Sequence, residues 1–267
     1  MHLYDSKEYC SDIAQVASLP IRWEIFQNTT ILISGASGLI GSFLVDVLMH
    51  KNEKENLCCR ILAVGRNAEK AWKRFAPYRN SNWIQIFSCD ITQAMPEWNG
   101  SIDYIIHAAS NTHPVAYATD PIGTITTNII GTDNLLRFAA DHGARRMLFA
   151  SSVEVYGENR GDVEYFTEDY CGYLNCNTLR AGYPESKRAG EALCQAYIKQ
   201  RGLDVVIPRL SRTYGPTMLM SDTKALSQFL KKGIAGEDIV LKSAGTQLFS
   251  YTYVADAVSA VLYCLFK

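Results

Sequence analysis

Short apolar runs alternate along this chain with longer segments in which apolar residues recur at helical spacing. The runs cover residues 30–34, 60–64, 83–87, 102–107, 146–150 and 205–208, and a periodic segment at 39–49 follows the first of them. Runs of Val, Ile and Leu are typical of strands buried on both faces, and intervening helices favour parallel pairing with right-handed crossovers. The pattern predicts an α/β fold with a doubly wound parallel sheet.

Three parts of the chain follow from this pattern. Residues 1–28 carry Tyr9, Ile13 and Val16 at helical spacing, which predicts an amphipathic N-terminal helix packed against the body. Residues 29–208 hold the sheet. Residues 209–267 contain a helical segment at 225–232 and apolar stretches at 239–242 and 251–266, and we expect a small, incomplete C-terminal lobe interleaved with the last elements of the sheet.

One long stretch lacks periodicity. Residues 157–180 are rich in Gly, Asn, Asp, Tyr and Cys. A segment of that length without its own secondary structure is usually functional or disordered. We expect it to lie over the mouth of a site.

A glycine turn, Gly35-Ala-Ser-Gly38-Leu-Ile-Gly41, joins the first strand to the first long helix. Gly35 permits a tight turn, Gly38 lets the backbone approach a pyrophosphate, and Gly41 allows close packing of helix on strand. A helix N-terminus also attracts anions. The turn predicts a dinucleotide site of the Rossmann type.

The second strand ends in Gly65-Arg66, where a carboxylate would ordinarily hold the adenosine ribose. A guanidinium matches a 2′-phosphate better than a pair of free hydroxyls, so Arg66 favours NADP over NAD. The alternative is that Arg66 only stacks on adenine, which would serve either cofactor.

Tyr183 and Lys187 lie four residues apart at the start of a helical segment, and therefore on one face. A nearby ammonium lowers the pKa of a phenol that otherwise ionises near ~10, which makes Tyr183 a candidate general base. Ser152 ends a hydrophobic strand and could hold a substrate hydroxyl against the phenolate. Glu154, two residues further on an extended segment, would point to the same side and could act as a second acid or base; alternatively it only anchors the neighbouring loop.

Composition excludes several classes of function. The 267 residues have a formal net charge of −1, so no basic excess favours nucleic acid or an anionic membrane surface. No apolar run is long enough to span a bilayer, and the polar N-terminus is unlike a signal peptide, so we expect a cytoplasmic protein. Eight cysteines without Cys-x-x-Cys are expected to be reduced thiols. The five histidines show no metal-ligand spacing, and we expect His107 to be a packed strand-end residue and the site to hold no metal.

Taken together, these motifs resemble the extended short-chain dehydrogenase/reductase family, in particular its nucleotide-sugar epimerases, dehydratases and decarboxylases. The resemblance covers nearly all of residues 29–267. Besides the glycine turn, the matching blocks are Cys89-Asp90-Ile91, Ile106-His107-Ala108-Ala109-Ser110, residues 127–132, residues 151–157, residues 183–187, residues 209–216 and Tyr253-Val254-Ala255-Asp256.

The resemblance implies roles for particular residues. Ser152, Tyr183 and Lys187 would be the catalytic set, with Glu154 as a second acid or base and Asn128 supporting the lysine. Residues that would bind the substrate are Thr112, Arg180, Arg212 and Tyr214. Residues that would bind the cofactor are Gly35, Ser37, Gly38, Leu39, Ile40, Gly41, Arg66, Asp90, Ile91, Ala108, Ala109, Ser110, Asn128, Tyr183, Lys187 and Pro208.

Finer matches indicate a branch of the family. The block from Arg180 to Arg188 resembles that of UDP-glucuronate decarboxylases, whereas Val153 stands where the dehydratases keep an Asp. Phe249 replaces the arginine of the family's Gly-x-x-x-Arg, here starting at Gly245, and a phenyl ring cannot donate hydrogen bonds to an anion. Arg212 stands where many relatives have Asn, so the cationic contact could have moved there; the alternative is an ordinary surface charge.

The resemblance implies an NAD(P)-dependent enzyme that acts on a nucleoside-diphosphate sugar through a transient 4-keto sugar, with epimerisation, dehydration and decarboxylation all open. A reductase of a small carbonyl compound and a non-catalytic dinucleotide-binding regulator are the alternatives. The family also implies a homodimer through the helices at 127–140 and 183–200, for which Leu136, Ala189 and Leu193 are candidate contacts.

Overall fold

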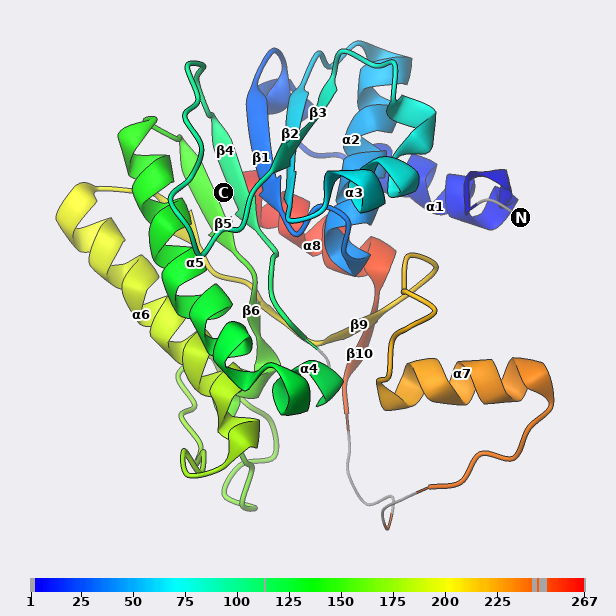
Figure 1. Ribbon diagram of the computed structural model, residues 1–267, viewed down its shortest axis with the longest axis vertical. Coiled ribbons are helices and arrows are strands. Elements are labelled where there is room, and N and C mark those ends of the chain that lie inside the picture. The colour runs from blue at the N-terminus through cyan, green and yellow to red at the C-terminus, as the bar shows by residue number, and fades with distance from the viewer. Residues whose placement is uncertain (1–2, 113, 242–243, 245–248, 267) are drawn as a thin grey trace.

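The computed structural model describes residues 3–112, 114–241, 244 and 249–266. Its main sheet has six parallel strands in the order β3-β2-β1-β4-β5-β7 (Figure 1). This confirms the doubly wound α/β fold. The strands are β1 (Thr30–Ser34), β2 (Arg60–Gly65), β3 (Ile84–Ser88), β4 (Tyr104–His107), β5 (Arg146–Phe149) and β7 (Val205–Val206).

The strand order reverses between β1 and β4, where Ile31 pairs with Tyr104 on one side and with Ile61 on the other. In open parallel sheets, ligands bind beyond the carboxyl ends of the strands at such a reversal. Two further pairs extend this edge: β6 (Ser151–Ser152) with β8 (Arg209–Leu210), and β9 (Arg212–Tyr214) with β10 (Tyr251–Tyr253).

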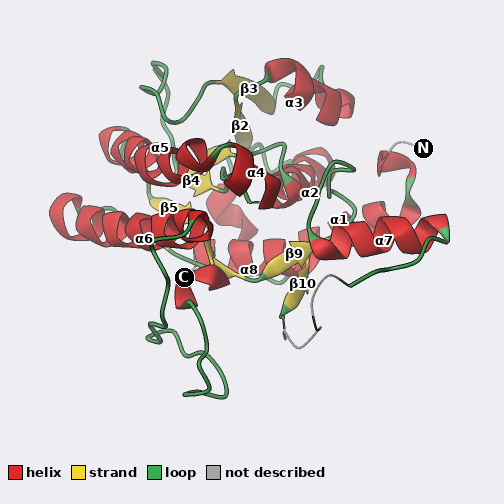
Figure 2. Ribbon diagram, turned by 60° about the horizontal axis from the view of Figure 1, so that its bottom comes forward, coloured by secondary structure: helices red, strands yellow, loops and turns green. Residues whose placement is uncertain are grey.

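Helices cover both faces of the sheet (Figures 1 and 2). Ile31 and Ile33 join the core under α1, α2 and α8, whereas Leu32 joins the core under α5 and α6, because successive strand residues point to opposite faces. The helices are α1 (Lys7–Ala17), α2 (Leu39–Glu55), α3 (Ala68–Arg74), α4 (Pro114–Thr119), α5 (Pro121–Asp141), α6 (Gly182–Arg201), α7 (Ala225–Ala235) and α8 (Val254–Phe266).

Helix α1 has the amphipathic character expected from the sequence. Tyr9, Ile13 and Val16 are buried in the first core, and the Ser6 side chain caps the helix by accepting from the Tyr9 N–H. The Tyr9 hydroxyl and the Arg74 guanidinium both bond to Asp46, which is fully buried. A buried carboxylate with these partners ties α1, α2 and α3 together, so the helix is an integral part of the body.

The segment 157–178 is irregular, as expected from its composition, and extends away from the sheet (Figures 1 and 2). The segment 157–180 was expected to lie over the mouth of a site, but only its last residue, Arg180, lines the cavity described below. Its base is held by an isolated antiparallel bridge between Glu158 and Tyr173. The Arg188 guanidinium donates to the carbonyl oxygens of Val155 and Gly172 at 2.7 and 2.8 Å. These bonds attach the residues just before the loop, and its returning part at Gly172, to helix α6.

The apolar stretch at 239–242 forms no helix or strand over its described residues, 239–241, and Lys242 lies outside the described residues. One detail differs from the sequence-based expectations. Leu136 was a candidate for a dimer contact, but it is fully buried in the core under α5, and this expectation is wrong because the residue faces the sheet. Within the described part of the chain, no helix has the length and apolar composition needed to cross a membrane.

Candidate active site

A cavity of about 410 Å³ lies at the carboxyl edge of the sheet. Its wall combines the glycine turn after β1, Ala108 and Ser110 after β4, residues 150–154 after β5, and the start of α6. Strands β8 and β9 and the start of α7 close the other side. A volume of this size suits a bound small molecule or part of a dinucleotide.

The glycine turn has the backbone that a pyrophosphate cradle needs. Gly35 has φ +70, and a Cβ there would lie 2.7 Å from the Ala109 nitrogen; a Cβ at Gly41 would lie 2.4 Å from the Gly35 oxygen. Gly38 caps the 17-residue helix α2 and offers no side chain to its first N–H groups. The turn and the helix N-terminus therefore fit the pyrophosphate of a dinucleotide.

The end of β2 is open where the adenosine would lie. A Cβ at Gly65 would meet nothing within 4 Å, and Arg66 is exposed. The Asp90 carboxylate accepts from the Thr92 N–H at 2.9 Å, which keeps the pKa of Asp90 below its usual value, with a further lowering from Arg66. The space beside Gly65 and the Arg66 guanidinium has room for the adenosine ribose of NAD and for the 2′-phosphate of NADP.

Several expected cofactor residues lie outside the cavity wall. The Ile91 side chain packs against α5, where a Cβ at Gly131 would lie 2.7 Å from it, so this side chain belongs to the core. The Pro208 carbonyl accepts from the Ser151 N–H and is committed to backbone pairing. The expected residues that do not line the cavity are Ser37, Arg66, Asp90, Ile91, Ala109, Asn128 and Pro208.

Tyr183 and Ser152 meet in the cavity. Burial raises the pKa of Tyr183 from 10.0 to about 12, a hydrogen bond with Ser152 lowers it, and the Glu154 carboxylate raises it. The net direction is upward, so the lowering of the Tyr183 pKa that the sequence predicts is not seen in this arrangement. The Lys187 ammonium lies 6.0 Å from the Tyr183 ring centroid.

Lys187 is buried behind the tyrosine. Its Nζ donates to the Ala150 carbonyl at 2.7 Å and lies 4.6 Å from the Phe149 ring centroid. Burial lowers the pKa of Lys187 from 10.5 to about 7. The ammonium is therefore a group that exchanges its proton near neutral pH.

Asn128 connects the end of β4 to the start of α6 through two serines. It is fully buried, donates to the Ser186 hydroxyl at 2.9 Å and accepts from the Ser110 hydroxyl at 2.8 Å. Ser186 in turn donates to the Tyr183 carbonyl at 2.8 Å. Asn128 thus braces the first turn of α6, and among the described residues no direct hydrogen bond joins it to Lys187.

Glu154 lines the cavity, as expected, but it lies in a helical turn and not on an extended segment. Residues 153–156 form a short 3-10 helix, so the extended path assumed for residues 152–154 is wrong. The Ser152 hydroxyl caps this helix by accepting from the Glu154 N–H at 3.2 Å. The Glu154 carboxylate lies 3.9 Å from the Arg180 guanidinium.

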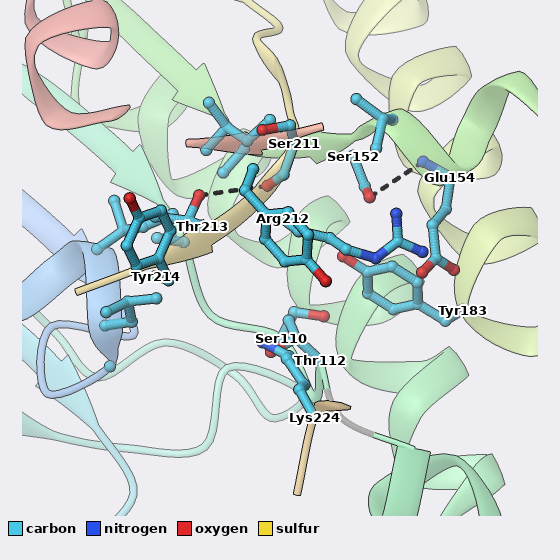
Figure 3. Close-up of a pocket in the computed structure, with 18 of the residues that line it drawn as sticks. Ser110, Thr112, Ser152, Glu154, Tyr183, Ser211, Arg212, Thr213, Tyr214 and Lys224 are labelled. Carbon is cyan, nitrogen blue, oxygen red and sulfur yellow. Dashed lines mark hydrogen bonds between the residues drawn. The ribbon is translucent and has the colours of Figure 1, made fainter. Parts of the chain in front are cut away.

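Figure 3 shows Ser152, Glu154 and Tyr183 at one end of the cavity and Tyr214 at the other, with Arg212 between them. Arg212 is half-buried in the cavity wall and is therefore not an ordinary surface charge. The remaining expected substrate residues, Thr112, Arg180 and Tyr214, also line the cavity.

Sequence reasoning missed part of the wall. The Tyr117 ring stacks on Tyr183 with 5.3 Å between centroids, and Lys224 is the residue that caps α7. Lys224 directly precedes a segment with helical periodicity, and this position at a helix start could have identified it from the sequence. No comparable sequence pattern marks Tyr117. The other missed residues are Ala150, Ser151, Val153, Leu210, Ser211, Thr213, Met218, Ala225, Leu226, Ser227 and Tyr251. Phe249, which the sequence analysis noted as the replacement of an arginine, also lines the cavity. Among the described residues, no group of three or more His, Cys, Asp or Glu side chains could hold a metal ion.

Similar proteins of known sequence are UDP-glucuronic acid decarboxylases. The chain is 35% identical over 239 residues to UDP-glucuronic acid decarboxylase 6 of Arabidopsis thaliana, covering 88% of this chain and 65% of that protein. It is 34% identical over 232 residues to UDP-glucuronic acid decarboxylase 1 of Xenopus tropicalis, covering 87% and 52%. The chain therefore spans about half to two thirds of the length of these relatives.

Solved structures share the fold. The dTDP-glucose 4,6-dehydratase DesIV of Streptomyces venezuelae, with NAD bound, matches with a TM-score of 0.74 and 24% identity over 90% of this chain and 72% of that one. The UDP-glucuronic acid 4-epimerase of Bacillus cereus, in complex with UDP-glucuronic acid and NAD, matches with a TM-score of 0.72 and 24% identity over 90% and 74%. The model of the NAD dependent epimerase/dehydratase family matches residues 31–267. The chain belongs to the NAD dependent epimerase/dehydratase family.

Proposed function

We propose that this chain is the core of an NAD(P)-dependent enzyme that acts on a nucleoside-diphosphate sugar through a transient 4-keto sugar, with decarboxylation of UDP-glucuronate as the favoured outcome. The observation that carries the proposal is the grouping of Ser152, Glu154 and Tyr183 in one cavity with the glycine turn. The likeness to UDP-glucuronic acid decarboxylases supports the choice of sugar.

The charge of the cavity supports an anionic substrate. Arg180, Arg212 and Lys224 line the wall, and Glu154 is its only carboxylate among the described residues. Cations that outnumber acids in a low-dielectric cleft attract a diphosphate. A neutral carbonyl compound, the substrate of a simple reductase, would not need them.

The chain's own residues would work as follows. The Ser152 hydroxyl would hold the sugar hydroxyl at Tyr183, and Tyr183, once ionised, would take the hydroxyl proton as the carbon is oxidised. The glycine turn, Tyr183 and Lys187 would hold the nicotinamide dinucleotide, which would supply a reversible hydride acceptor for this carbon. Lys187 lies next to Tyr183, and its lowered pKa lets it exchange a proton near neutral pH. This supports a role for Lys187 in moving the proton away from Tyr183.

The ketone then activates the neighbouring carboxylate. In the 4-keto sugar the carboxyl group is β to the carbonyl, so its C–C bond breaks with the electron pair passing to the enolate, and CO2 leaves. The enolate must be protonated at carbon on one face. Glu154 is our candidate for this acid, since its side chain lines the same cavity and is only partly exposed.

Incubation of the protein with a panel of nucleotide sugars, with NAD and with NADP, tests the proposal. A catalytic amount of cofactor should suffice, and mass spectrometry should show that UDP-glucuronate loses the mass of CO2. The matched control is Tyr183→Phe, which should retain cofactor binding and lose turnover. Stoichiometric consumption of reduced cofactor with a small carbonyl compound would instead show a reductase, and cofactor binding without turnover of any sugar would show a regulator.

A further inference from the structure

Arg212 and Phe249 form a stacked pair in the cavity wall. The Arg212 guanidinium lies 3.7 Å from the Phe249 ring centroid. Arg212 is the first residue of strand β9 and pairs with Tyr251, the first residue of β10. Phe249 lies two residues before Tyr251, so the segments that carry Arg212 and Phe249 run side by side. A cation over an aromatic face at this distance is attracted by the ring quadrupole, and the flat faces hold the guanidinium in one orientation.

Within the described part of the chain, the N–H donors of this guanidinium have no hydrogen-bonding or ion-pair partner. Among the described residues, Arg212 forms no ion pair and its side chain no hydrogen bond, whereas Arg180 lies 3.9 Å from the Glu154 carboxylate. Arg212 is also half-buried and lines the cavity. Stacking covers one flat face of a guanidinium and leaves its N–H edges, which fit paired anionic oxygens, available.

We propose that Arg212, oriented by Phe249, binds a pair of anionic oxygens of the substrate and is a specificity-determining residue of this pocket; the inference rests on the proposed function. In a nucleotide sugar those oxygens belong either to the diphosphate or to a carboxylate of the sugar. Phe249 is a positioning residue, because it acts only through the guanidinium.

Calorimetric titration with UDP, UDP-glucose and UDP-glucuronate tests the inference in the full chain. Arg212→Gln should weaken binding on the order of 10- to 100-fold. An equal loss for all three ligands assigns the oxygens to the diphosphate, and a loss confined to UDP-glucuronate assigns them to the carboxylate. Unchanged affinity for all three would overturn the inference. Arg212→Lys should keep part of the affinity, since charge remains while the planar fork is lost.

Phe249→Leu should weaken the same ligands about 3- to 5-fold, whereas Phe249→Tyr, which keeps the ring, should bind as the wild type does. Affinities equal to the wild type in Phe249→Leu would remove the positioning role. The wild-type affinity should also fall more steeply with salt than that of Arg212→Gln, a difference that a merely structural role would not produce.

Two controls separate this inference from others. NAD affinity should be unchanged in every variant, and Arg22→Gln, a change at an exposed arginine in the N-terminal segment, should bind all ligands normally. If the wild type binds none of the three nucleotides, the proposed function and the inference both fail. If the wild type binds them and Arg212→Gln binds them equally well, the inference alone fails.

Discussion

The Tyr253 hydroxyl donates a hydrogen bond of 2.5 Å to the Asp12 carboxylate, and these residues lie 241 positions apart. Asp12 belongs to helix α1 and Tyr253 to strand β10. The Tyr253 ring packs edge-on against Tyr214, which lines the cavity, with 5.5 Å between centroids. Burial, and next the Asp12 carboxylate, raise the pKa of Tyr253, so the phenol remains a donor. The N-terminal helix is thus linked through two contacts to the wall of the site.

Breaking this link should lower stability. We expect Asp12→Ala and Tyr253→Phe each to reduce the free energy of unfolding by about 1 to 2 kcal/mol, with the double variant losing less than the sum because both remove one bond. Urea titration measures all three. Gln15→Ala, at an exposed position on the same helix, is the matched control and should change little. Additive losses would show that the bond is not what stabilises the contact.

Glu154→Gln should separate the two halves of the proposed reaction. The amide cannot exchange a proton, so cofactor binding and the first hydride transfer should persist while the later step slows on the order of 10²-fold or more. Rapid-mixing absorbance of the reduced nicotinamide follows the first step, and product analysis follows the second. Glu158→Gln, an exposed carboxylate outside the cavity, is the control. Full turnover in Glu154→Gln would exclude Glu154 as an acid or base.

The buried lysine should leave a signature in stability against pH. Because burial lowers the pKa of Lys187 to about 7 in the folded chain, the unfolded chain binds this proton more tightly between pH 7 and 10.5. Stability should therefore rise with pH in that window relative to Lys187→Met, on the order of a few kcal/mol in total, and stop changing below it. Urea titration from pH 6 to 9.5 measures the slope.

The same titration on Lys199→Met supplies a control, because this lysine is exposed on the same helix. Any offset from losing the bond to the Ala150 carbonyl is independent of pH and does not disturb the comparison. A constant difference between wild type and Lys187→Met across the window would mean that Lys187 stays charged in the folded protein.

Arg66 should set the cofactor preference. We expect its exposed guanidinium, beside the open position at Gly65, to favour NADP over NAD, and Arg66→Ala to remove that preference by weakening NADP roughly tenfold with little effect on NAD. Calorimetry with both cofactors measures this. Arg60→Ala, an exposed arginine at the other end of the same strand, should behave as wild type. Equal affinities of the intact protein for NADP and NAD would contradict the assignment.

Helices α5 and α6 should pair with a second copy of the chain. Ile122, Ile125 and Ile130 on α5 are exposed, and Ile122 is 74% exposed, which is unusual for a large apolar side chain. Light scattering should show a dimer at micromolar concentration, and Ile130→Glu should shift it to monomer. Ile234→Glu, at an equally apolar exposed position on α7, should not. A monomeric wild type would refute the pairing.

The features that sequence alone determined are those set by neighbouring residues. The apolar runs at 30–34 and 60–64 became β1 and β2 because strand burial follows directly from an unbroken apolar pattern. The glycine turn has the predicted backbone, since a positive φ at Gly35 is a local steric matter. Tyr183 and Lys187 lie on one helix because their spacing matches its period.

Tertiary structure decided the contacts between segments that return from distant parts of the chain. Three contacts of this kind are the bonds of Asn128, the stacking of Arg212 on Phe249 and the bond from Tyr253 to Asp12. They depend on where the crossover helices and loops bring distant segments together, which no local sequence pattern encodes. The proton affinity of Lys187 is decided in the same way. Spacing predicts a charged lysine beside Tyr183, but desolvation depends on everything packed around the ammonium, and only the folded chain supplies that surrounding.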